Sequence, residues 1–163
     1  MVLSRLRFED TAMQPEVKSS FTPRPSAPGL KCGITEEMTA RLVDAFYAKV
    51  RLDALLGPVF EAAIHDWDSH LSKLRDFWSS VTLMTGRYKG RPVPAHVGLP
   101  GIGPEMFGRW LCLFRETARE ECPPPAAALY IASAERIASS LQMSIDFHRG
   151  ALGAVLPEGR EKP

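Results

Sequence analysis

Apolar residues recur every three or four positions along four stretches of this 163-residue chain. This period is typical of helices that each bury one face. It is clearest in residues 66–85, where the stripe consists of Trp67, His70, Leu71, Leu74, Phe77, Trp78, Val81 and Met84. His70 is the polar member of the stripe, and a buried imidazole needs a partner for its nitrogen atoms.

Three further stretches have the same period: residues 35–51, 104–121 and 126–149. Thr35 can cap the first of these helices, and Pro104 suits the first turn of the second. Tyr47 carries the only hydroxyl on the apolar face of the first helix, and a buried phenol needs a partner or a ligand. No stretch shows sustained alternation with period two, so the sequence predicts an all-α domain.

Glycines and prolines separate these helices. Gly57 and Pro58 are expected to stop a short helical turn that begins at Asp53, and Gly86 is expected to be the C-cap of the helix over residues 66–85. Residues 86–103 are too rich in proline and glycine for more than a turn or two around His96. His70 on a helix and His96 on a short loop segment could therefore face each other across a bound group.

The composition fits one globular domain with polar ends. Hydrophobic residues make up 45% of the chain, which is enough for one core. Residues 1–33 are rich in proline, serine, threonine and charge, and we expect a flexible extension there. The domain is expected over residues 34–150, followed by a polar tail over residues 151–163.

Charge and cysteine content exclude several classes of protein. The net charge is +1 with no basic stripe, which gives no footprint for nucleic acid. No apolar window is long enough to span a membrane, and the first residues lack the apolar core of a secretory signal, so a cytoplasmic location is expected. The three scattered cysteines contain no Cys-x-x-Cys pair, which argues against a disulfide framework, a zinc knuckle and covalent haem attachment.

Four residues place a polar or aromatic group where packing alone would favour leucine: Tyr47, His70, His96 and Trp110. Taken singly, each is more often a core residue than a ligand. Together they stand among more aromatic and methionine side chains than four helices need for packing. Such a lining with two histidines suits a flat apolar cofactor whose metal binds one imidazole and leaves an adjustable polar pocket on its other side.

Several segments, in order and with similar gaps, resemble the pattern of group III truncated haemoglobins: Phe46–Arg51, Leu56–Phe60, Trp67–Leu71, Phe77–Trp78, Tyr88–Pro92, Ala95–Leu99 and Arg109–Phe114. The resemblance covers about residues 34–149. It implies a shortened globin, a two-over-two helical sandwich around a non-covalent haem b.

The resemblance also implies roles for particular residues. His96 matches the proximal iron ligand. Tyr47, His70 and Trp110 match the distal ligand pocket, in which His70 is also a possible sixth ligand to the iron. The remaining residues implied for the haem pocket are Phe46, Phe60, Lys73, Leu74, Trp78, Leu99 and Phe107. Of these, Lys73 could reach a haem propionate.

The implied function is reversible binding of dioxygen, carbon monoxide or nitric oxide. Hydrogen-bond donors in the distal pocket would slow ligand release, which favours detoxification of nitric oxide and dioxygen, redox chemistry or sensing over bulk transport. The chain has no Gly-x-Gly-x-x-Gly segment that opens a βαβ unit, so turnover as a nitric oxide dioxygenase or peroxidase would need an external reductase.

Two alternatives remain open at the level of sequence. One is a cofactor-free helical interaction module, in which the histidines and tryptophans belong to the core. The other is a zinc or di-iron enzyme that uses His65, His70 and either Asp66 or Asp68. The spacing of the two histidines fits this poorly, because ligands that share a helical face are three or four residues apart.

Overall fold

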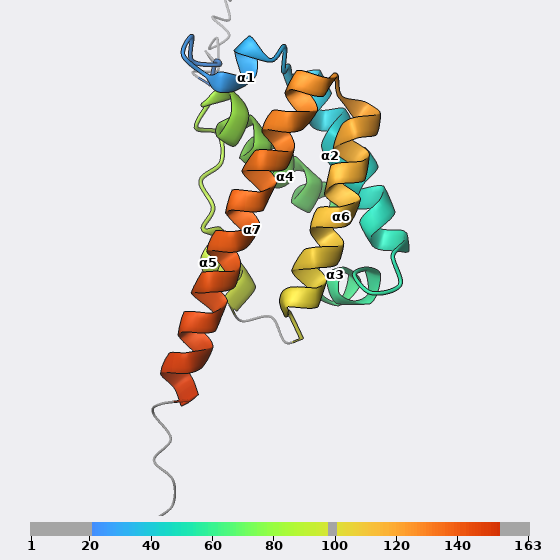
Figure 1. Ribbon diagram of the computed structural model, residues 1–163, viewed down its shortest axis with the longest axis vertical. Coiled ribbons are helices and arrows are strands. Elements are labelled where there is room, and N and C mark those ends of the chain that lie inside the picture. The colour runs from blue at the N-terminus through green and yellow to red at the C-terminus, as the bar shows by residue number, and fades with distance from the viewer. Residues whose placement is uncertain (1–20, 98–100, 154–163) are drawn as a thin grey trace, which may run out of the picture.

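In the computed structural model, residues 21–97 and 101–153 are described, and their regular structure is entirely helical (Figure 1). The helices are α1 (Pro28–Lys31), α2 (Glu36–Leu52), α3 (Gly57–Ala63), α4 (Trp67–Leu83), α5 (Pro92–Val97), α6 (Pro104–Glu121) and α7 (Pro124–Gly153). This confirms the all-α prediction. None of these helices combines the length and the apolar character needed to cross a membrane.

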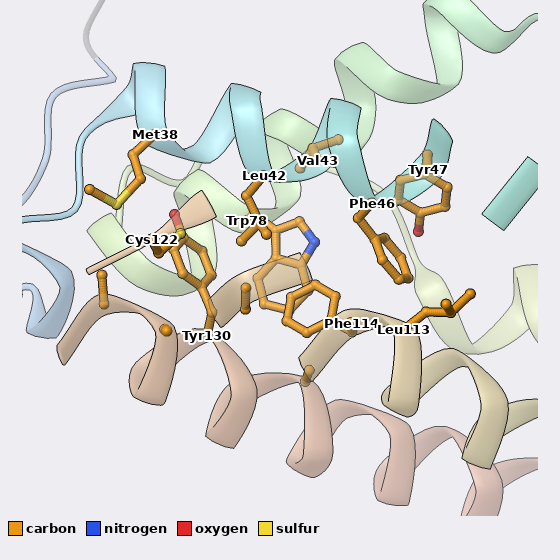
Figure 2. Close-up of a cluster of buried hydrophobic side chains, with 14 of the residues drawn as sticks. Met38, Leu42, Val43, Phe46, Tyr47, Trp78, Leu113, Phe114, Cys122 and Tyr130 are labelled. Carbon is orange, nitrogen blue, oxygen red and sulfur yellow. The ribbon is translucent and has the colours of Figure 1, made fainter. Parts of the chain in front are cut away.

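The four long helices form two layers. α2 packs on α4, α6 packs on α7, and α2 also packs on α6, so that one pair covers the other (Figure 1). Aromatic side chains fill the space between the layers (Figure 2). Trp78 stacks on Phe114 with 4.9 Å between ring centroids, and Tyr130 meets Trp78 edge-on at 5.8 Å. The two-over-two sandwich expected from the sequence is the observed architecture.

Side-chain caps fix where α2 and α4 begin. The hydroxyl of Thr35 accepts a hydrogen bond from the backbone N–H of Met38 at 3.1 Å. The carboxylate of Asp66 accepts one from the N–H of Ser69 at 3.0 Å. Each cap satisfies an amide that the first turn of a helix leaves without a partner. These two helices carry Tyr47 and His70, two of the three residues predicted for the distal pocket.

The prediction that Gly57 and Pro58 stop a helical turn is wrong, because they begin α3. The Asp53 carboxylate accepts a hydrogen bond from the N–H of Leu56 at 2.9 Å and turns the chain into the new helix. Pro58 fits the first turn, where no intrahelical amide is needed. A Cβ atom at Gly57 would lie 2.7 Å from the carbonyl oxygen of Arg51, so α3 can approach the end of α2 this closely only with glycine there.

The prediction of Gly86 as the C-cap of α4 is also wrong. The helix ends at Leu83, and Met84 is the cap, with a left-handed φ of 55°. The hydroxyls of Ser79 and Thr85 lie 2.8 Å apart and hold the chain in this early turn. Local side-chain hydrogen bonding therefore ends the helix before the glycine.

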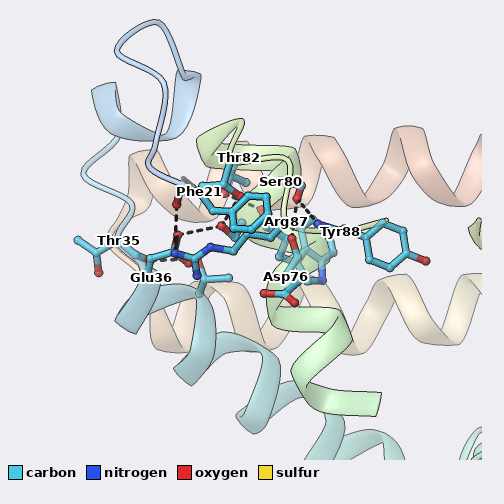
Figure 3. A network of polar contacts seen from close by, with 12 residues as sticks. Phe21, Thr35, Glu36, Asp76, Ser80, Thr82, Arg87 and Tyr88 are labelled. Carbon is cyan, nitrogen blue, oxygen red and sulfur yellow. Dashed lines mark hydrogen bonds and ion pairs between the residues drawn. The ribbon is translucent and has the colours of Figure 1, made fainter. Parts of the chain in front are cut away.

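The segment that follows α4 is tied to the start of α2 and to the N-terminal part of the chain (Figure 3). The guanidinium of Arg87 lies 3.5 Å from the carboxylate of Glu36 and donates a hydrogen bond to the carbonyl oxygen of Phe21 at 3.2 Å. The N–H of Tyr88 donates to the hydroxyl of Ser80 at 2.9 Å. These contacts direct the chain from α4 toward α5.

Residues 21–33, which belong to the predicted N-terminal extension, contact the start of the domain and the end of α4, while the domain boundary at residue 34 stays a prediction. The N–H of Arg24 donates to the carbonyl oxygen of Leu83 at 3.0 Å, and Ala27 is 0% exposed. Burial of an apolar side chain and pairing with the open end of α4 hold this segment. The predicted extension over residues 1–20 lies outside the described residues.

Helix α7 exceeds its predicted bounds at both ends. It begins at Pro124, because prolines are tolerated in a first turn, and it continues to Gly153. The tail predicted from residue 151 therefore starts inside a helix. Residues 154–163 lie outside the described residues.

The hydroxyl of Tyr130 makes a buried hydrogen bond between α7 and α2. Its oxygen lies 2.8 Å from the hydroxyl oxygen of Thr39, which donates its own proton to the carbonyl of Thr35 at 2.9 Å, so Tyr130 is the donor between the layers. We expect Tyr130→Phe to lower the free energy of unfolding by about 1 kcal/mol in denaturant titrations. Thr39→Val should lower the free energy of unfolding by less in the Tyr130→Phe protein than in the wild type. If the two substitutions had fully additive effects, the hydrogen bond between these side chains would be contradicted.

Candidate functional site

Tyr47 lies on the face of α2 that packs toward α6, next to Phe46 at one end of the core cluster (Figure 2). Its side chain is only 4% exposed, and the indole of Trp110 is the hydrogen-bonding neighbour of its hydroxyl. Burial raises the pKa of Tyr47 well above its usual value, while the nearby indole of Trp110 lowers it by a smaller amount. The phenol therefore keeps its proton and has it available for a bound ligand.

His70 lies on α4 opposite Tyr47, half-buried, with 6.0 Å between the ring centroids. Trp67 completes the group, since its ring centroid lies 5.9 Å from that of His70 and 6.3 Å from that of Tyr47. Burial lowers the pKa of His70, and the charges of Lys73 and His96 lower it further. The imidazole is therefore mostly neutral at pH 7.

His96 lies on the short helix α5, and its Nδ1 atom is 2.7 Å from the carbonyl oxygen of Pro92. A carbonyl oxygen can only accept, so Nδ1 carries a proton, and the neutral tautomer that makes this bond has its lone pair on Nε2. This is the tautomer in which a histidine binds a metal through Nε2 while its other nitrogen is held by a second partner. The short helix confirms the turn or two predicted around His96.

Trp110 reaches the site from α6. It meets Phe46 edge-on at 5.1 Å and stacks on Phe114 at 5.2 Å between ring centroids. The neighbouring Arg109 pairs with the carboxylate of Asp53 at 2.7 Å, and the Asp53 side chain is only 6% exposed. This pair attaches α6 to the turn between α2 and α3, and so sets the position of Trp110 beside Tyr47.

The other residues predicted for the pocket divide into two sets. Those with apolar surface still accessible are Phe60, Leu74 and Phe107, while Lys73 is exposed on α4. Phe46 and Trp78 are 0% and 2% exposed, because the aromatic core encloses them, and their contact with the cofactor stays a prediction. Leu99 lies outside the described residues.

Partly buried apolar side chains pack against the core cluster, and those on α3, α4 and α6 are Phe60, Trp67, Leu71, Leu74, Phe77, Val81, Met106, Trp110 and Leu111. Apolar side chains with a few polar groups among them are typical of a binding site for an apolar group. In its neutral tautomer, His96 supplies a single metal ligand through Nε2. In the described ranges, no three His, Cys, Asp or Glu side chains converge on a common point, so the zinc or di-iron alternative gains no support.

Sequence reasoning missed Arg51 and Glu61. The Nε atom of Arg51 donates to the Glu61 carboxylate at 2.9 Å, and the Arg51 guanidinium lies 4.6 Å from the centroid of the Trp67 ring. The pairing depends on how α3 returns toward the end of α2, and no sequence signal indicated that course.

No family model matches the chain. The group 3 truncated hemoglobin ctb of Campylobacter jejuni is 36% identical over 113 residues, which is 67% of this chain and 89% of that protein. The chain belongs to the group III truncated haemoglobins. The crystal structure of the group III truncated hemoglobin from Campylobacter jejuni agrees, with a TM-score of 0.66 at 35% identity over 69% of this chain and 91% of that one.

This membership confirms the resemblance drawn from the ordered sequence segments. A truncated haemoglobin is a globin, so a haem cofactor and a small gaseous ligand are implied for the chain. The residues gathered here fit such a group, because a free imidazole nitrogen and a broad apolar lining are what a non-covalent haem requires.

Proposed function

We propose that this truncated haemoglobin binds haem b non-covalently, with His96 as the proximal iron ligand. The observation that carries the proposal is the 2.7 Å contact between His96 Nδ1 and the Pro92 carbonyl, which makes Nε2 the ring nitrogen that can bind iron. When bound, haem would supply an iron atom that can take a diatomic ligand.

On the proximal side, α5 orients the imidazole. The Pro92 carbonyl accepts the Nδ1 proton of His96, which fixes the direction of the ring and makes Nε2 a stronger donor to a metal. Helix α5 packs on α7, so His96, the proposed iron ligand, is carried by a helix that contacts the core of the domain. The partly buried apolar side chains around it keep water from the site.

On the distal side, Tyr47, His70 and Trp110 form the pocket of the proposed site. The hydroxyl of Tyr47 and the indole N–H of Trp110 can donate hydrogen bonds to a diatomic ligand, and neutral His70 can donate from one ring nitrogen or bind iron through the other as a sixth ligand. Each hydrogen bond in a dry pocket is worth roughly one to three kcal/mol. Ligand release is therefore slow in this proposal.

Slow release suits detoxification of nitric oxide and dioxygen, redox chemistry or sensing better than delivery of oxygen. In redox turnover, an external reductase would supply the electrons. Cys32, Cys112 and Cys122 are all free, which supports the cytoplasm as the proposed location.

The test is the absorption spectrum of the protein purified from cells supplied with haem. We expect a Soret band in the ferric protein and a shift of that band when carbon monoxide is added after reduction. The visible bands before carbon monoxide report whether His70 occupies the sixth position, and His70→Ala serves as the control for that assignment. A folded but colourless wild type would contradict the proposal and favour the cofactor-free interaction module.

A further inference from the structure

We infer that Arg51 and Glu61 form a clamp on Trp67 and thereby control access to the distal pocket. The clamp holds Trp67 against Tyr47 and His70, and so limits how easily the His70 imidazole moves aside for an entering ligand. Arg51 and Glu61 are positioning residues, since they act through Trp67. This inference rests on the proposed function of the site.

The clamp joins three elements that are separate in the chain. Arg51 lies in the last turn of α2, Glu61 in α3, and Trp67 is the first residue of α4. The Arg51 Nε atom donates to Glu61 Oε1 at 2.9 Å, and the guanidinium stands 4.6 Å from the centroid of the indole ring. A guanidinium over the face of tryptophan is an attractive cation–π contact.

Glu61 faces both of its partners. The hydrogen bond from Arg51 is the main cause that lowers the pKa of Glu61, and the nearby Trp67 indole lowers it as well. The carboxylate therefore stays charged at neutral pH and keeps Arg51 in place over the indole ring.

Trp67 is held by these neighbours rather than by a well-formed hydrogen bond. Its Nε1 atom is enclosed, and its N–H interacts with the Glu61 carboxylate, but no partner in the described ranges meets strict hydrogen-bond geometry with it. An enclosed N–H without a well-formed hydrogen bond is costly, so contacts with the rest of the ring must compensate. Those contacts are the Arg51 guanidinium on one face and the rings of Tyr47 and His70, at 6.3 and 5.9 Å between centroids.

The three rings restrain one another. The ring centroids of Tyr47 and His70 are 6.0 Å apart, so each of the three rings lies against the other two. In the inferred clamp, Trp67 limits the movement of the His70 imidazole. The side chains of Arg51 and Glu61 are each 48% exposed. An ion pair this exposed is weak and is screened by salt, which makes the clamp a soft restraint.

The kinetic test uses the haem-loaded protein and carbon monoxide. Arg51→Met keeps an unbranched apolar side chain and removes the charge. We expect carbon monoxide association after flash photolysis to become about three- to tenfold faster, the change that loss of one exposed ion pair and one cation–π contact would produce. In a His70→Ala background the same substitution should change the rate by less than about twofold, because the restrained group is gone.

The matched control is Arg115→Met. It breaks another partly exposed pair, Arg115 with Glu135 at 2.7 Å between α6 and α7, and should leave the association rate unchanged. An unchanged rate in a folded, haem-loaded Arg51→Met protein would overturn the inference. An effect of equal size in the His70→Ala background would also overturn it.

A second readout does not depend on haem. With 5-fluorotryptophan incorporated, Trp67→Phe assigns one of three fluorine resonances. Arg51→Met and Glu61→Gln should each move the Trp67 resonance and leave those of Trp78 and Trp110 in place. If the Trp67 resonance stays fixed in both variants, there is no clamp. If the wild type shows no Soret band, the proposed function is removed, and the fluorine measurement alone then decides whether the clamp exists. Glu61→Gln also replaces Arg51→Met in both tests if the latter does not fold.

Discussion

His96→Ala is expected to leave a folded protein whose haem affinity is at least about a hundredfold lower. Mutation of a residue that only hydrogen-bonds to a metal ligand lowers metal affinity about ten- to a hundredfold, and His96→Ala removes the proposed ligand itself. His96 offers its free Nε2 atom from a short helix, and alanine removes that atom without breaking the helix. The hydrogen bond that is lost lies within α5 itself, so the tertiary fold should persist. Haem content per protein and the Soret band measure the first effect, and far-ultraviolet circular dichroism the second.

Two controls separate loss of the iron ligand from a general effect of losing a histidine. His65→Ala removes an exposed imidazole next to the N-cap of α4 and should leave the spectrum unchanged. Free imidazole added to His96→Ala should restore part of the Soret band, because it can enter the space that the side chain leaves. A His96→Ala protein with the spectrum of the wild type would show that His96 is not the proximal ligand.

The long helices of this fold were predictable because each buries one face. Their ends were harder, since glycine and proline both stop and start helices. Gly57 and Pro58 begin α3 because the Asp53 carboxylate turns the chain there. Helix α4 ends at Leu83, with Met84 as its cap, because the hydroxyls of Ser79 and Thr85 bond to each other before the chain reaches Gly86. Both outcomes depend on local side-chain hydrogen bonds that hydrophobic periodicity does not encode.

The site was predictable where a polar group interrupts an apolar stripe. Tyr47 and His70 were identified in this way, and the structure brings their rings to 6.0 Å. Burial depth was not predictable, because periodicity assigns a face to a residue but not its depth. Trp78 is 2% exposed in the aromatic core, and its contact with the cofactor stays a prediction. The Arg51–Glu61 clamp depends on three elements meeting in space, which no local pattern reveals.

Tyr47→Phe is expected to speed dioxygen release about ten- to a hundredfold, because one donor in a dry pocket is worth roughly one to three kcal/mol and each 1.4 kcal/mol is about tenfold. Stopped-flow displacement of dioxygen by carbon monoxide measures that rate. Carbon monoxide is a poorer hydrogen-bond acceptor, so its own release should change less. Equal changes for both gases would point to altered access to the pocket rather than to a lost donor.

Stability provides the second half of this prediction. The Tyr47 hydroxyl is buried and has the Trp110 indole as its hydrogen-bonding neighbour, so phenylalanine should change the free energy of unfolding by less than about 1 kcal/mol. Tyr130→Phe is the matched control, because its hydroxyl is bonded to Thr39 at 2.8 Å and lies between the layers. That variant should lose stability and leave dioxygen release unchanged. A stability loss at Tyr47 with no change in release would instead make its hydroxyl a structural group, and the distal pocket would then depend on His70 and Trp110 alone.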